Sequence, residues 1–127
     1  MEFLKAEHFK ALSNPGVLSE QLLSPHNSAS ERITITRVTL DPGAVQTTHS
    51  HATSEQIWLA LAGVGTLLLA EGHTAEFKQG EVVRFADGDL HGLQNSGPQP
   101  FVYLSVTSPP INFSNAYGRG RKATRPM

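Results

Sequence analysis

Three histidines are spaced so that they could hold one metal ion. His49 and His51 lie two positions apart, and side chains at that spacing point to the same face of an extended strand. His91 would supply a third imidazole nitrogen from another strand. The chain has no cysteine, which excludes a thiolate site and a disulfide framework. These residues predict a site for one divalent ion of nickel, zinc, manganese or iron, which imidazole does not distinguish.

Two neighbouring residues, Glu55 and Gln56, compete as the fourth donor. Only one of them can face the ion in a regular strand, because successive side chains point to opposite faces. If Gln56 faces inward, Trp58 shares its face and Glu55 is left at the rim as a candidate general base. A neutral amide leaves more of the ion's charge uncompensated than a carboxylate does, which favours Lewis-acid chemistry over redox chemistry.

Short strands must position these side chains. Segments with strand character alternate with turn signals such as Asp41-Pro-Gly43 and Asp87-Gly88, a spacing typical of an antiparallel sandwich or barrel. One helical turn or two is predicted over Glu7–Leu12. The predicted strands are Arg32–Leu40, Gln56–Ala62, Val64–Ala70, Thr74–Phe77, Glu81–Phe85, Leu90–Gln94 and Phe101–Thr107.

The two histidine blocks resemble the paired motifs of the cupin family, with every spacing kept. Gln56 stands at the family's glutamate position, and Ala86 replaces its proline. The resemblance implies an all-β fold, the double-stranded β-helix or jelly-roll barrel. It also implies a single domain over residues 1–127, with a core at about 30–108 and an irregular basic tail at 109–127. The matching positions are Gly43, His49, His51, Gln56, Gly63, Gly80, Gly88, His91 and Asn95.

Within that family, the His-Ser-His block followed by Glu-Gln-Ile is similar to small cupins that process unsaturated uronates. Some polyketide-cyclase cupins are similar in using three His and one Gln. The resemblance implies His49, His51, Gln56 and His91 as metal ligands. It implies isomerisation, cyclisation or elimination on a sugar-acid or polyketide-like small molecule. Where the uronate enzymes carry an Asp and an Arg, Ser105 and Ile111 stand instead, which argues against that particular activity.

Two alternatives remain open. The same ligand cage with iron would suit a dioxygenase, and a barrel without an acid–base pair would suit a non-enzymatic small-ligand-binding module. Further candidates for the pocket are Trp58 as an apolar wall or core residue, and Arg37 and Tyr103 as polar groups that orient a substrate. The remaining histidines, His8, His26 and His73, are predicted at the surface.

The whole-chain properties limit the partners. A formal net charge of −1 gives no electrostatic reason to expect nucleic acid or an anionic membrane. No apolar run reaches the roughly 18 residues of a membrane helix, and no signal-peptide pattern begins the chain, so we expect a cytoplasmic protein. The outward residues Ile57, Leu59 and Leu61, with Leu67–Leu69, exceed what one barrel face needs and favour a homodimer.

Overall fold

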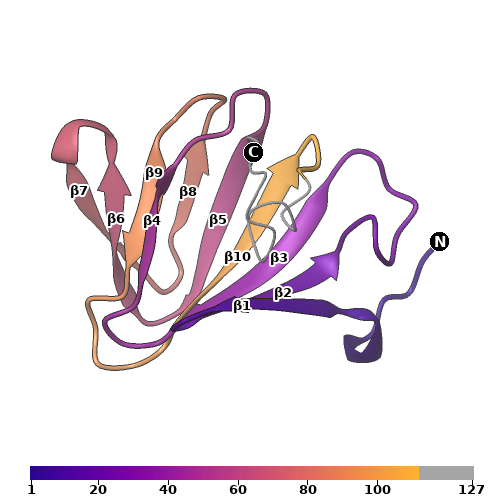
Figure 1. The fold of residues 1–127 in the computed structure, drawn as a ribbon, viewed down its shortest axis with the longest axis horizontal. Coiled ribbons are helices and arrows are strands. Elements are labelled where there is room, and N and C mark those ends of the chain that lie inside the picture. The colour runs from indigo at the N-terminus through magenta and orange to yellow at the C-terminus, as the bar shows by residue number, and fades with distance from the viewer. Residues whose placement is uncertain (112–127) are drawn as a thin grey trace.

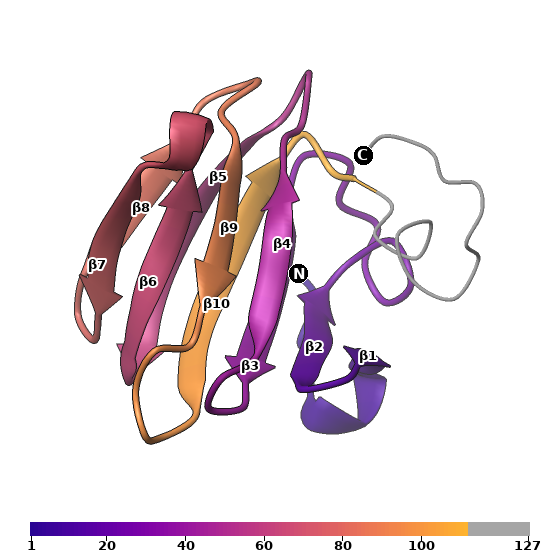
Figure 2. The same ribbon diagram turned by 60° about the vertical axis from the view of Figure 1, so that its left-hand side comes forward.

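Two antiparallel β-sheets pack face to face (Figures 1 and 2). The computed structural model describes residues 1–111. The larger sheet has the strand order β1-β2-β3-β10-β5-β8, and the smaller sheet has the order β4-β9-β6-β7. The strands are β1 Lys10–Asn14, β2 Val17–Leu23, β3 Thr34–Leu40, β4 Val45–His49, β5 Glu55–Ala62, β6 Val64–Leu69, β7 Thr74–Lys78, β8 Val82–Phe85, β9 His91–Gln94 and β10 Phe101–Ser108.

This architecture confirms the predicted all-β jelly-roll barrel. Every strand predicted over residues 32–107 is present, with ends that differ by one or two residues. The cause is strict alternation, since β3 and β10 bury every second side chain. Trp58, Phe101 and Tyr103 are among the largest side chains that this alternation places between the sheets. The predicted basic tail lies mostly outside the described residues, and the predicted domain limits stay a prediction.

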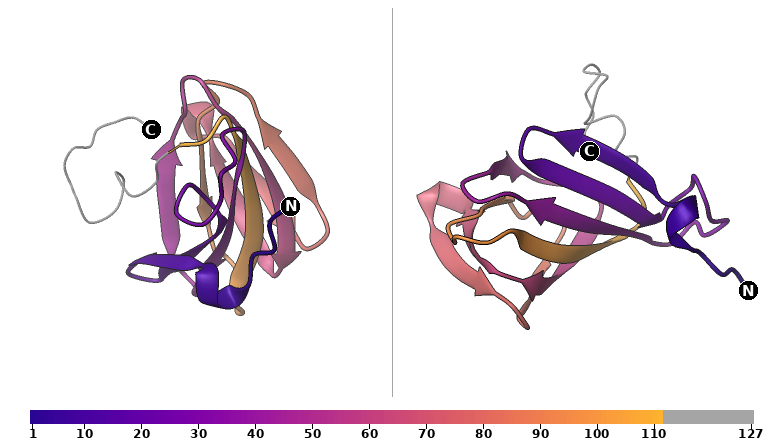
Figure 3. Two further views of the ribbon diagram at one scale, coloured as in Figure 1. Left: turned by 90° about the vertical axis from the view of Figure 1, so that its right-hand side faces the viewer. Right: turned by 90° about the horizontal axis from the view of Figure 1, so that it is seen from below.

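The N-terminal hairpin corrects one prediction. A 3-10 turn covers Ala6–His8, and β1 begins at Lys10, so the helical turn predicted over Glu7–Leu12 is wrong beyond His8. β1 pairs with β2 along its whole length, and this pairing overrides the local preference. Seen from below (Figure 3, right), the hairpin lies beside β3 at one end of the larger sheet. No helix in residues 1–111 is long and apolar enough to cross a membrane.

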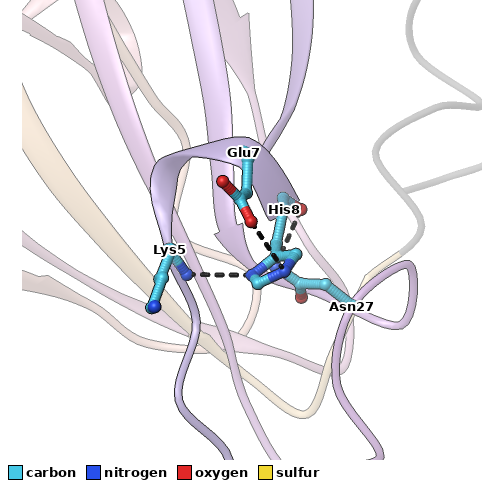
Figure 4. A network of polar contacts seen from close by, with 4 residues as sticks. All are labelled: Lys5, Glu7, His8 and Asn27. Atoms are coloured by element: carbon cyan, nitrogen blue, oxygen red, sulfur yellow. Dashed lines mark hydrogen bonds and ion pairs between the residues drawn. The ribbon is translucent and has the colours of Figure 1, made fainter.

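A polar network anchors the N-terminal turn (Figure 4). The backbone N–H of Lys5 donates to His8 Nδ1 at 3.1 Å, and Asn27 Nδ2 donates to the His8 carbonyl at 3.2 Å. His8 Nε2 lies 3.8 Å from the Glu7 carboxylate. His8, His26 and His73 are all exposed, as predicted.

An irregularity in the pairing of β4 with β9 lies beside the histidines. Gln46 pairs with Leu93, and the next pair is His49 with His91, so β4 carries one extra residue there. This is a β-bulge. Gly92 faces it: a Cβ at that position would lie 2.7 Å from the Gln46 carbonyl oxygen and 3.0 Å from the Thr48 nitrogen. The absence of a side chain at Gly92 lets the bulged backbone approach and sets His49 opposite His91.

We expect Gly92→Ala to destabilise the fold by about 1–3 kcal/mol, the usual cost of forcing an extra methyl against atoms that cannot yield. The variant should also bind zinc more weakly than the parent, because the bulge that aligns His49 with His91 must shift. Denaturant unfolding and a zinc titration measure the two effects. Gly97→Ala is the control for a general steric cost: its Cβ would lie 3.1 Å from the Val64 carbonyl oxygen, also a tight contact, but Gly97 is not part of the bulge, so stability should fall while zinc affinity stays parental. A Gly92→Ala protein with parental stability and zinc affinity would contradict this account.

Candidate metal centre

Three histidines from two neighbouring strands and one loop converge. His49 ends β4, His51 follows in the next loop, and His91 begins β9. Their ligand atoms all lie within 4.8 Å of one another. The expectation that one strand carries both His49 and His51 is corrected, since β4 ends at His49. The loop is held instead by Gly88, whose N–H donates to the His51 carbonyl at 2.8 Å and ties it to the turn before His91.

Backbone carbonyls fix the orientation of two of these rings. His49 Nδ1 lies 3.1 Å from the Thr47 carbonyl oxygen, and His91 Nδ1 lies 2.8 Å from the Asp89 carbonyl oxygen. A carbonyl can only accept, so each neutral ring carries its proton on Nδ1 and keeps a lone pair on Nε2. His91 Nε2 is buried without a hydrogen-bond partner in the described part of the chain. An orphaned buried acceptor is costly unless something binds it, and a divalent ion fits this donor set.

Burial also keeps these rings neutral. It lowers the pKa of His49 below its usual 6.5. For His91, burial first and then the neighbouring His49 lower the pKa to about 4. Because a metal competes with the proton for the same lone pair, a neutral imidazole at neutral pH is ready to bind an ion.

Gln56 faces the interior next to this centre, and Glu55 does not. Gln56 is 3% exposed. Its Oε1 accepts from Trp58 Nε1 at 3.0 Å, and its Nε2 donates to Thr107 Oγ1 at 2.9 Å. Since an indole N–H can only donate, this contact fixes which amide atom is the oxygen, and that oxygen keeps a second lone pair. Glu55 points to the outer face, where its carboxylate lies 2.8 Å from Arg84 Nε.

A small pocket of about 40 Å³ adjoins His49. Residues of β1, β2, β3, β5 and β10 line it together with Gln46 and His49 of β4. Trp58 and Tyr103 belong to its wall, stacked with ring centroids 4.2 Å apart. The Tyr103 hydroxyl donates to Gln46 Oε1 at 2.7 Å. Gln56 lines the same pocket as His49.

Arg37 does not reach this pocket. Its neighbours Thr36 and Val38 are buried and line the wall, so strand alternation turns Arg37 to the opposite face. There its Nε lies 2.9 Å from a carboxylate oxygen of Glu20, the residue opposite it on β2. The structure therefore separates Arg37 from Trp58 and Tyr103, although all three were candidates for the same site.

Sequence reasoning missed several residues that shape the centre. Gly92 follows His91 directly, and a glycine inside a strand pattern is a known signal of a bulge or a close backbone approach. Phe85 stacks on the His91 ring with centroids 4.3 Å apart and planes inclined by 13°. Thr107 accepts from Gln56. The strand pattern of the sequence places Phe85 and Thr107 inward and carries no signal for these contacts.

In metal-free protein, we expect the free energy of unfolding to fall as the pH drops from about 6.5 towards 4. The pKa of His91 is about 4 in the folded chain against a usual value of 6.5, so the unfolded chain binds this proton first and is favoured in that window. Urea unfolding across this pH range measures the slope. His91→Gln should give a shallower slope, and the exposed-residue control His73→Gln should keep the parental one. Equal slopes for all three proteins would contradict the assignment.

Known proteins share this architecture. KdgF from Halomonas sp. superposes with a TM-score of 0.75 at 20% identity, over 90% of this chain and 98% of that one. The polyketide cyclase RemF from Streptomyces resistomycificus gives 0.74 at 22% identity, over 87% and 80%. At these identities the likeness shows the fold alone.

The sequence comparisons identify the family. Uncharacterized protein MJ1618 of Methanocaldococcus jannaschii is 26% identical over 115 residues, which cover 88% of this chain and 91% of that protein. Residues 36–107 match the family described as Cupin domain. Since this match spans more than half of the 127 residues, the chain belongs to the cupin domain family.

Proposed function

We propose that this cupin is a metal-dependent enzyme of small-molecule metabolism, with His49, His51, His91 and Gln56 as the ligands of one divalent ion. The observation that carries the proposal is the convergence of three imidazoles within 4.8 Å beside a pocket. A bound ion would act as a Lewis acid on a carbonyl or enolate oxygen. Isomerisation, cyclisation or elimination of an oxygen-rich substrate is the matching chemistry.

The neutral donor set favours this chemistry. Three uncharged imidazoles and an amide oxygen cancel none of the ion's double charge, and the nearest carboxylate along β5, that of Glu55, is held on the outer face by Arg84. An ion without anionic ligands polarises a substrate oxygen more strongly and is less easily oxidised. Redox work with dioxygen is therefore the weaker candidate for this site.

The chain's own residues bind and orient the substrate. Trp58 and Tyr103 stack in the wall of the pocket, and Gln46 holds the Tyr103 hydroxyl. Glu55 pairs with Arg84 on the outer face of β5, so proton transfer to or from a substrate falls to Tyr103 or to solvent in the pocket.

A non-enzymatic binding module is the second candidate. Within residues 1–111, the pocket wall has no carboxylate, lysine or arginine, so it offers no strong acid–base pair. A ligand that binds tightly and returns unchanged from the metal-loaded protein would favour this function over catalysis.

Purified protein should carry about one equivalent of metal, measured by elemental mass spectrometry. His91→Ala should lose it, and Gln56→Ala should weaken binding by about tenfold or more, a loss in the range for removing a supporting group of a metal site. Gln56→Glu should bind more tightly, since a carboxylate of the same shape still accepts from Trp58 and neutralises one charge. His73→Ala is the control and should keep the parental content.

The identity of the metal separates the reactions. Nickel, zinc or manganese supports the Lewis-acid enzyme, and iron with substrate-dependent oxygen uptake supports the dioxygenase instead. A wild-type protein that stays metal-free after loading with divalent ions would overturn the enzyme and leave the binding module.

We also propose that two copies pair through the outer face of the larger sheet. The outward residues of β5 and β8 are apolar and adjacent there, with Ile57 40%, Leu61 37% and Val82 62% exposed. Leu59 pairs with Leu104 on one side and Val82 on the other, so the patch is continuous across three strands. The Arg84–Glu55 ion pair at its border carries both signs, which suits a two-fold interface that meets itself.

Light scattering after size exclusion should give twice the chain mass of 13.7 kDa. Val82→Arg places a charge in the apolar patch and should give a monomer. Val45→Arg is the matched control, because Val45 is 46% exposed on the smaller sheet, and it should stay dimeric. A monomeric parent protein would overturn the pairing.

A further inference from the structure

The amide of Gln56 is held by two hydrogen bonds inside the larger sheet. Trp58 Nε1 donates to Gln56 Oε1 at 3.0 Å, and Gln56 Nε2 donates to Thr107 Oγ1 at 2.9 Å. Thr107 pairs with Gln56 across the neighbouring strand β10. The three side chains are buried, with exposed fractions of 3% for Gln56 and 1% for each partner. Bulk water therefore does not compete for either bond, and an amide that left its partners would stay buried without them.

The two partners act differently on the amide. An indole N–H can only donate, so Trp58 requires an oxygen opposite it and disfavours a flipped amide, which would face it with a second donor. A hydroxyl can donate or accept, so Thr107 satisfies whichever amide atom faces it. Trp58 thus decides which atom is the oxygen, and Thr107 holds the other atom in place.

The Trp58 ring is itself fixed by rings from both sheets. It stacks on Tyr103 of β10 with centroids 4.2 Å apart, and it meets Phe85 of β8 at 5.0 Å with planes inclined by 79°. It also meets the His91 ring of β9 edge-on, with centroids 5.4 Å apart and planes at 89°. One indole therefore contacts a histidine carried by the smaller sheet and the amide carried by the larger sheet.

The orientation of the amide decides whether it can bind an ion. An amide nitrogen carries two N–H groups and offers no lone pair, whereas Oε1 keeps a second lone pair beside the one that accepts from Trp58. The histidines lie on the smaller sheet and on the loop after β4, so an ion bound to them and to Gln56 would join the two sheets. A ligand side chain that is already held in place loses less conformational entropy when the ion binds.

We propose that Trp58 and Thr107 are positioning residues of the metal centre, which hold the Gln56 amide with its oxygen available to an ion before any ion is bound. This role rests on the proposed function, in which Gln56 is a ligand. Trp58 selects the oxygen, and Thr107 fixes the amide against rotation. Outer-shell groups of this kind contribute to the affinity of metal sites.

Thr107 is the residue to vary, because valine has nearly its shape without the hydroxyl. Thr107→Val removes the acceptor of Gln56 Nε2, and Thr107→Ser keeps it. Thr34 supplies the matched control, since it lies opposite Thr107 on β3, is 3% exposed, and has an Oγ1 without a hydrogen-bond partner within residues 1–111. Thr34→Val therefore makes the same chemical change on the next strand without removing a hydrogen bond. Thermal unfolding checks that all three variants fold.

Cobalt(II) gives the first readout, because its visible absorption depends on the ligands around it. We expect Thr107→Val to bind cobalt about fivefold more weakly than the parent, which corresponds to about 1 kcal/mol, and to change the absorption bands. Thr107→Ser should restore both properties, and Thr34→Val should match the parent. Parental affinity and absorption in Thr107→Val would overturn the proposal, as would an equal change in Thr34→Val.

The metal-free protein gives the second readout. Trp58 is the only tryptophan of the chain, so its indole N–H gives one proton–nitrogen NMR signal that reports the bond to Gln56 Oε1. We expect Thr107→Val to shift this signal and to speed its exchange with solvent, because the amide is then held at one end only. Thr107→Ser and Thr34→Val should keep the parental signal. An unchanged signal in Thr107→Val would show that Thr107 does not hold the amide.

Failure of the proposed function has a different signature. A parent protein that binds no cobalt would overturn that function and the role of both residues toward an ion, while the NMR signal would still decide whether they hold the amide. A parent that binds cobalt, with a Thr107→Val variant that behaves like it, would overturn the positioning role and leave the proposed function standing.

Discussion

The centre depends on two hydrogen bonds between an imidazole and a backbone carbonyl two residues earlier in the chain. His49 contacts Thr47 in this way, and His91 contacts Asp89. Each bond consumes the proton-bearing nitrogen and leaves the other with its lone pair. Burying such a lone pair without a partner lowers the stability of the folded barrel. In the described residues this acceptor is His91 Nε2, and a bound group would satisfy it.

Backbone geometry then brings the two rings together. The bulge in β4 shifts the pairing by one residue, and Gly92 gives the bulged backbone room. Asn95 fixes the other end of β9, since its Nδ2 donates to the carbonyls of Leu40 and Gln99 and its Oδ1 accepts from the Gly97 N–H. One buried amide therefore joins the end of β3 to the loop between β9 and β10. The register of β9, and with it the place of His91, follows from these local constraints.

How much of this was predictable depends on the kind of interaction. The strands β3, β5 and β10 could be predicted from their β-branched and apolar residues between turn signals, and the inward face of Gln56 from its place in the family motif. The β1–β2 hairpin could not, because β1 is short and its single half-buried position, Leu12, gives no period. The face of Arg37 was ambiguous for another reason. A shift of the strand register by one residue would turn its side chain to the other face, and only its pairing with Glu20 fixes that register. Contacts between distant positions, such as Gln56 with Thr107, leave no local pattern.

The same alternation links the centre to its pocket. In the described chain, arginine and glutamate pairs lie on the outer face of the larger sheet, and uncharged groups line the inner wall. A divalent ion held by Gln56 and the histidines would then be the one full charge facing a ligand. Its field would act on ligand oxygens without a counter-charge on the described wall to weaken it. The absence of charged side chains along the described wall therefore strengthens polarisation at the ion, because no neighbouring carboxylate weakens its field.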